Sequence, residues 1–230
     1  SEFFFWLGES TGSTRDLDVY LLNFNHFKST LPASIRDDLY PLHGFLLAKQ
    51  QQAQKELANK LRSTKYMFSL SEWEQYLKKP APLKLVEPDA KLTIKKLADQ
   101  RLWKNYKRVI EQGNSITKNS TSETLHELRK SCKKLRYLIE FFQSLYPENQ
   151  IKHFIKHLKE LQDVLGSFQD LSVQESTLKL YYEEMRNANM GSDTLVAMDV
   201  LIQNLNTFRR SARKDFAVKF ATFKHEENQS

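Results

Sequence analysis

Residue types that interrupt or cross-link a folded chain are scarce in this sequence. Its 230 residues include only six glycines, six prolines and one cysteine. Glycine and proline interrupt helices, so few helix breaks are expected. Long runs are rich in Leu, Lys, Gln, Glu and Ala, which favour helices, and the sequence therefore predicts an almost entirely helical fold. The single cysteine, Cys132, excludes an internal disulfide and makes the cytoplasm the expected compartment.

The sequence also contains no long apolar run and no secretion signal. No stretch approaches about 18 consecutive apolar residues, so no segment is expected to span a membrane. The aromatic run at residues 3–6 has neither a basic segment before it nor a cleavage site after it, so it does not match a signal peptide. We interpret it as the end of a buried helix that begins before Ser1.

Acidic residues are in the minority. The chain has 35 Lys and Arg residues against 28 Asp and Glu residues, which gives a formal net charge of +7. Hydrophobic residues make up 40% of the chain, which is too much for a disordered protein and enough for a substantial core. A basic excess of this size favours an anionic partner without identifying it.

Periodicity and capping signals divide the chain into helical segments. Residues 12–14 are interpreted as a break, Ser71 as a helix cap and Gly113 as a helix stop. The three prolines between Pro80 and Pro88 predict a hinge between a first half, residues 1–87, and a second half, residues 88–230. The expected helices cover residues 15–28, 34–63, 71–79, 89–112, 122–146, 148–165, 167–189 and 193–224.

The segment from His126 to Tyr137 carries the strongest functional signal. At about 100° per residue, its apolar residues fall on one side of a helix and its basic residues on the other. Cations spaced i,i+3 or i,i+4 repel each other by about a few tenths of a kcal/mol per pair, and only Glu127 and Glu140 flank them. A bound polyanion would remove that repulsion. We call the basic residues of this segment the first basic row: His126, Arg129, Lys130, Lys133, Lys134 and Arg136.

An internal repeat adds a second set of cations. Residues 11–19 match residues 165–173, and residues 53–61 match residues 212–220, in the same order and at nearly the same spacing. This predicts an all-α fold of two pseudo-symmetric antiparallel helical bundles, whose first copy is incomplete at its N-terminus. The basic faces of the two copies would line one shared groove. We call the set on the last helix the second basic row: Arg209, Arg210, Arg213 and Lys214.

On these residues the sequence resembles the CHAD domain, the conserved histidine α-helical domain family. The resemblance rests on His126-x-x-Arg129-x-x-x-Lys133-Lys134-Leu135-Arg136-Tyr137, on Leu161-Gln162-Asp163-Val164-Leu165-Gly166-Ser167-Phe168-Gln169-Asp170, and on Gly12-x-x-Arg15-Asp16-Leu17-Asp18-Val19. It implies two four-helix bundles around a basic groove that binds inorganic polyphosphate without catalysis and without a cofactor. The expected location is the cytoplasm, including polyphosphate granules. The expected polyphosphate ligands are both basic rows together with Lys49, Lys55 and Arg15.

Three other hypotheses were weighed against polyphosphate binding. A helical nucleic-acid binder would use the same cations, with Tyr137 and Tyr146 stacking on bases. An enzyme acting on polyphosphate is disfavoured, because the sequence has no glycine-rich phosphate loop and no Ser/His/Asp order. His153 and His157 have the i,i+4 spacing of a metal pair, but lysines surround them and no third ligand is tied to them by spacing, so no metal is expected.

Overall fold

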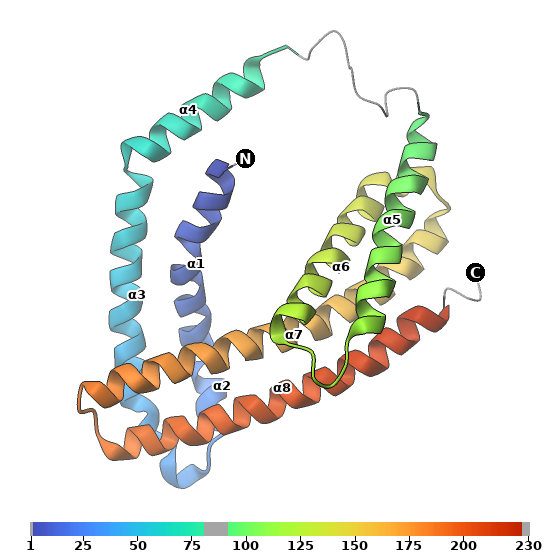
Figure 1. The fold of residues 1–230 in the computed structure, drawn as a ribbon. Coiled ribbons are helices and arrows are strands. Elements are labelled where there is room, and N and C mark those ends of the chain that lie inside the picture. Colours follow the sequence, from blue (N-terminus) through green and yellow to red (C-terminus); the bar gives the residue numbers. More distant parts are fainter. Residues whose placement is uncertain (1, 81–91, 227–230) are drawn as a thin grey trace. The chain divides into compact units, whose positions relative to one another are not determined.

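Every element of the described chain is helical (Figure 1), which confirms the all-α prediction. The computed structural model describes residues 2–80 and 92–226, so most of the predicted hinge lies outside the described residues. The α-helices are α1 (Glu2–Leu22), α2 (Phe24–Ser29), α3 (Tyr40–Leu61), α4 (Thr64–Lys78), α5 (Ile94–Ser115), α6 (Ser122–Phe142), α7 (Glu148–Asn187) and α8 (Ser192–Glu226). Short 3₁₀ turns lie at Ala33–Ile35, Asp37–Leu39 and Gln143–Leu145.

Three of the glycines that were expected to interrupt helices lie inside them. Gly12 is within α1, Gly113 within α5 and Gly166 within α7, so the predicted breaks at these positions are wrong. A glycine costs a helix interior only about 1 kcal/mol relative to alanine, which the packing of a long apolar face outweighs. The two helices predicted over residues 148–189 are therefore one continuous helix, α7.

Three helix starts also differ from the prediction. The α4 helix begins behind Ser63, whose side-chain oxygen accepts a hydrogen bond from the backbone N–H of Tyr66, and not behind Ser71. The α5 helix begins behind Thr93, which caps the N–H of Lys96 in the same way. Two 3₁₀ turns occupy the start of the helix that was predicted over residues 34–63. Helix α3 begins only at Tyr40, with a proline in its first turn.

The first compact unit contains the described part of residues 1–84 together with Leu178–Gln203. Helix α1 packs against α3, and Gln50 of α3 donates a 2.8 Å hydrogen bond to Asp18 of α1. Lys49 forms a 2.6 Å ion pair with Glu184 from the end of α7. The buried apolar residues of the unit include Leu17, Tyr20, Leu39, Leu42, Leu46, Met185, Ala197 and Met198.

The second compact unit contains the described part of residues 85–177 together with the described part of residues 204–230. It comprises α5, α6, the first three quarters of α7 and the second part of α8. Leu178–Gln203 pack with the first unit, so the compact units divide the chain differently from the predicted halves. The halves, residues 1–87 and 88–230, describe the proposed repeat and stay a prediction. The core of this unit is formed by Val109, Leu125, Leu128, Cys132, Leu135, Ile139, Leu158, Leu161, Leu165, Phe168, Ala212, Phe216, Phe220 and Phe223.

Helix α6 lies in this unit with its apolar stripe buried as predicted. Leu128 and Cys132 are fully buried, and burial raises the pKa of the Cys132 thiol to about 12. Gln162 of α7 donates a 2.9 Å hydrogen bond to the carbonyl oxygen of Cys132, while the hydroxyls of Ser122 and Ser172 lie 3.3 Å apart. These two contacts fix α6 and α7 antiparallel, so the basic side of α6 has a defined orientation.

Candidate polyanion-binding site

The first basic row lies on the side of α6 away from the core. The helix is capped by Thr121, whose side-chain oxygen accepts a hydrogen bond from the backbone N–H of Thr124. Because the opposite stripe is buried from Leu125 to Phe142, the helix cannot rotate and the row stays on the side away from the core. Lys130 and Lys134 are exposed, and His126, Arg129, Lys133 and Arg136 are partly buried.

Few carboxylates neutralise this row. Lys130 forms a 2.7 Å ion pair with Glu127, and the Nε atom of Arg136 lies 3.7 Å from Glu140. The second distance is too long for a strong hydrogen bond, so Arg136 is only partly satisfied. In residues 2–80 and 92–226, the remaining members of the row have no carboxylate partner: His126, Arg129, Lys133 and Lys134.

Three buried nitrogen atoms in the row lack hydrogen-bond partners, and one of them is the Nε atom of Arg136. The Nδ1 atom of His126 and the Nε atom of Arg129 are shielded from solvent, and the described chain offers neither a partner. An unsatisfied buried polar atom costs about 1–3 kcal/mol, more for a charged group. An anion that reached the guanidinium of Arg129 would recover part of that cost, so these atoms favour a ligand at this end of α6.

The basic surface extends from α6 towards α5. The pKa of Glu127 lies below its usual value, chiefly because Lys130 donates a hydrogen bond to it, with smaller effects of the charges of His126 and Arg108. Arg108 belongs to α5, which packs against α6. Helix α5 was not expected to be a source of cations, although its Lys and Arg residues outnumber its two acidic residues, Asp99 and Glu111. The exposed cations of α5 include Lys96, Lys104, Lys107 and Arg108.

The second basic row is divided between structural and exposed members. Arg209 forms a 2.9 Å ion pair with Glu175, a buried carboxylate that also accepts a 3.2 Å hydrogen bond from Asn206. Arg210 and Lys214 point away from these contacts and are exposed. Arg209 is therefore held by the fold, whereas Arg210 and Lys214 remain accessible to an anion.

Arg213 ties α8 to the loop that precedes α6. Its guanidinium donates 2.6 Å hydrogen bonds to the carbonyl oxygens of Lys118 and of Ser120, and lies 5.1 Å from the ring centre of Phe168. Burial, and to a smaller extent the charge of Arg209, lowers the pKa of Arg213. The role assigned to this residue from the sequence was a direct phosphate ligand. Its contacts make it a residue that positions the start of α6, and its role as a phosphate ligand stays a prediction.

Replacing Arg213 by glutamine is expected to lower the free energy of unfolding by about 1–3 kcal/mol, because hydrogen bonds from a charged donor to two carbonyl oxygens are lost. Arg210→Gln is the matched control, since Arg210 is exposed on the same helix and should change stability by less than about 0.5 kcal/mol. Chemical denaturation of both variants measures the difference. Equal stabilities would show that the contacts of Arg213 do not hold the loop.

The two rows reach neighbouring turns of α7. A Cβ atom placed on Gly166 would lie 3.6 Å from the Nε and Nη2 atoms of Arg129, and Arg213 packs on Phe168 two residues further along. Both rows therefore belong to the second compact unit and meet α7 at the same level of the bundle. Arg129 and Arg213 therefore approach the same part of α7.

The three candidates from the first half lie in the other compact unit. Lys49 is paired with Glu184, and its ammonium group also lies 5.0 Å from the ring centre of Phe45. Lys55 on α3 and Arg15 on α1 are exposed and have no carboxylate partner in the described chain. A shared groove between these residues and the first basic row stays a prediction.

Neither a metal centre nor a membrane span is found in the described ranges. No group of three His, Cys, Asp or Glu side chains in residues 2–80 and 92–226 is placed to hold a metal ion. The rings of His153 and His157 are in contact, with centres 4.4 Å apart. In the same ranges, no helix has the length and apolar character needed to cross a bilayer.

Comparison with known proteins agrees with the resemblance noted in the sequence. A search of curated proteins found no match. A family model described as the CHAD domain matches residues 2–179, which include α1 to α6 and most of α7. Since this match covers well over half of the 230 residues and includes the whole first basic row, the chain belongs to the CHAD domain family.

Proposed function

We propose that this protein binds inorganic polyphosphate, without catalysis, along the first basic row of α6. The observation that carries the proposal is the shortage of carboxylates on that row, together with the buried and unsatisfied Nε atom of Arg129. Membership of the CHAD family supports it, because polyphosphate binding is associated with this domain. A protein with this function would be found with cytoplasmic polyphosphate.

The chemistry of the row suits a linear phosphate polymer. Polyphosphate carries about one negative charge per phosphoryl unit and has no base or sugar to recognise, so it requires spaced cations on a rigid support. Arg129 and Arg136 are seven residues apart, which is about 10 Å along a helix. Arginine offers paired donors to phosphate oxygens and lysine offers a compact charge, so the row provides both kinds of contact.

The geometry suggests different roles for the candidate ligands. Arg129, Lys133 and Lys134 would contact phosphate directly, with His126 donating at the start of the helix. Arg210 and Lys214 would extend the site onto α8, while Arg209 and Arg213 position the helices. Lys49, Lys55 and Arg15 would contribute if the two copies of the repeat form one groove. The matched segments lie on α1 and α7 and on α3 and α8, which favours that duplication.

Single-stranded nucleic acid is the second candidate ligand. Beside Lys130 and Lys134, the side chains of Tyr137 and Phe141 are 53% and 77% exposed, and they line a shallow hollow on α6. Exposed aromatic rings next to cations are typical of surfaces on which bases stack. The exposed rings of Tyr137 and Phe141 therefore favour nucleic acid, because polyphosphate has no bases to stack on them.

A competition assay separates these ligands. Labelled polyphosphate bound to the protein is challenged with unlabelled polyphosphate or with single-stranded RNA at equal phosphate concentration. We expect unlabelled polyphosphate to displace the label and RNA to displace it at least about tenfold less well, because RNA has a lower charge density. Equal displacement by RNA would favour the nucleic-acid function. Shortening of the polyphosphate during the incubation would contradict a non-catalytic role.

A further inference from the structure

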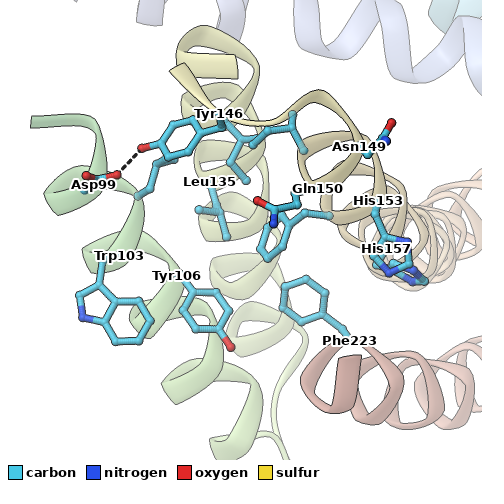
Figure 2. A pocket seen from close by; sticks show the side chains of 14 residues that line it. Asp99, Trp103, Tyr106, Leu135, Tyr146, Asn149, Gln150, His153, His157 and Phe223 are labelled. Atoms are coloured by element: carbon cyan, nitrogen blue, oxygen red, sulfur yellow. Dashed lines mark hydrogen bonds between the residues drawn. The ribbon is translucent and has the colours of Figure 1, made fainter. Parts of the chain in front are cut away.

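An apolar cavity of the second compact unit lies on the opposite side of α6 from the first basic row. Figure 2 shows this cavity between α5, α6 and α7, with Phe223 of α8 closing one side. Leu135 and Ile139, which belong to the buried stripe of α6, line it from that helix. Its volume of about 740 Å³ falls within the range of about 300–1,000 Å³ that is typical of small-molecule sites.

The walls of the cavity are aromatic and mutually braced. Trp103 stacks on Tyr106 with ring centres 5.6 Å apart, and Phe154 packs edge-on against Phe223 at 5.6 Å. Tyr106 contacts both phenylalanines, at 6.3 and 6.4 Å, so the rings support one another. The indole of Trp103 is 58% exposed, so this aromatic wall is accessible to a further ring, which could stack on it or pack edge-on.

The carboxylate at one edge of the cavity is already satisfied. Asp99 accepts a 2.7 Å hydrogen bond from the hydroxyl of Tyr146 and forms a 3.0 Å ion pair with Lys95. Tyr146 first, and Lys95 second, hold the pKa of Asp99 below its usual value. Burial first, and Asp99 second, raise the pKa of Tyr146, so its hydroxyl stays uncharged. This edge therefore offers no free charge to a ligand.

The histidines at the other edge are also committed to the protein. The rings of His153 and His157 contact each other, and both residues have further interactions within the described chain. The charge of His157 acts on Glu160, whose pKa lies below its usual value chiefly because Lys219 donates a hydrogen bond to it. Tyr106 also has a partner in the protein. Every ionisable side chain that lines the cavity in the described chain is thus already engaged.

An uncharged polar group is nevertheless available at the cavity. In Figure 2 the amide of Gln150 points from α7 towards the side of Leu135. In residues 2–80 and 92–226, this amide has no hydrogen-bond partner in another residue. A primary amide can both donate and accept a hydrogen bond without carrying a charge. The cavity therefore combines an aromatic interior with a neutral hydrogen-bonding group.

We propose that this cavity binds a small uncharged aromatic molecule, with its ring against Trp103 and Tyr106 and a neutral polar group, such as an amide or a hydroxyl, at Gln150. A charged ligand would lose its hydration without finding a free counter-charge, which is unfavourable. The site goes beyond polyphosphate binding and does not depend on it, because it uses the buried side of α6 and not the first basic row.

The test is a fluorescence titration with Nile red, an uncharged dye, followed by displacement with naphthamide, naphthoate or naphthylmethylamine. These competitors share one ring system, substituted at the same position, and are neutral, anionic and cationic respectively at neutral pH. We expect naphthamide to displace the dye at an at least about tenfold lower concentration than either charged competitor. Equal or stronger displacement by naphthoate or by naphthylmethylamine would overturn the assignment of an uncharged ligand.

Variants locate the dye, which also binds apolar surfaces elsewhere. Ile151→Trp places a larger side chain in the cavity and is expected to weaken dye binding at least about tenfold. Trp103→Ala removes an exposed ring of the wall, which carries little risk to folding, and should weaken binding about three- to tenfold. Phe208→Ala is the control, since this exposed ring of α8 lies outside the lining, and it should leave binding unchanged. Unaltered affinity in both cavity variants would overturn the site.

Lys95→Gln tests why the cavity prefers an uncharged ligand. This change removes the ion-pair partner of Asp99 and leaves a less compensated carboxylate at the edge of the cavity. Naphthylmethylamine should then improve at least about threefold relative to naphthamide. An unchanged ratio would contradict the argument from engaged charges. Polyphosphate binding is measured in every variant and should persist, so a failure of this site is distinguishable from a failure of the polyphosphate proposal.

Discussion

Replacing Lys133 and Arg136 together by glutamate is expected to weaken polyphosphate binding at least about a hundredfold. Two cations of the first basic row are lost, and two anions are placed where the polymer would lie. Both positions lie outside the buried stripe of α6, and glutamate is a good helix former, so the helix should persist. Fluorescence polarisation with labelled polyphosphate measures the affinity, and circular dichroism checks that helix content is unchanged.

The matched control for this variant reverses Lys78 and Lys79 at the end of α4. Both are exposed, lie outside the two basic rows and change the net charge by the same amount. A general electrostatic attraction would weaken equally in both double variants. A specific site on α6 would leave the control within about threefold of the parent protein, because Lys78 and Lys79 do not belong to that site. Equal losses in the two variants would therefore refute the site.

Gly113→Ala is expected to lower the free energy of unfolding by about 2 kcal/mol, after the better helix propensity of alanine is taken into account. Gly113 is buried in α5, and a Cβ atom there would overlap the ring of Phe220 on α8. Phe220 is itself buried and stacked on Phe216, with ring centres 5.7 Å apart, so it has little room to move away. Denaturation with urea measures the change.

Gly44→Ala provides the opposite outcome in the same protein. Gly44 lies within α3 and is exposed, and a Cβ atom there would meet no other atom within 4 Å. Alanine at this position should stabilise the protein by about 0.5–1 kcal/mol, because it favours the helix without a steric cost. If Gly113→Ala were equally stabilising, the close approach of α5 to α8 would be wrong.

The amphipathic helix at the centre of the site could be predicted from the sequence because its information is local. The buried positions from Leu125 to Phe142 follow the helical period, and they determine which side the cations occupy. The family resemblance rests on the same local pattern. The continuity of α1 and α7 through Gly12 and Gly166 could not be predicted, since a glycine costs a helix only about 1 kcal/mol and packing along the two helices decides the outcome.

The roles of individual arginines depend on contacts that are distant in sequence. Arg213 meets Lys118 and Ser120 across 95 and 93 residues, and Arg209 meets Glu175 across a helix hairpin. Helical periodicity puts both arginines on a basic face but does not show which of them the fold already uses. The cavity lined by Trp103, Phe154 and Phe223 could not be predicted for the same reason, since these residues come together only in the folded bundle.

Calorimetric titration of the protein with long-chain polyphosphate, pyrophosphate and single-stranded RNA, at two salt concentrations, tests the central claim most directly. We predict tight binding of long-chain polyphosphate, weak binding of pyrophosphate and intermediate or weaker binding of RNA. The polyphosphate affinity should fall steeply at the higher salt concentration, because each phosphate contact releases a counterion. Polyphosphate affinity that does not change with salt, or that does not exceed the affinity for pyrophosphate, would contradict a site built from unneutralised cations along α6.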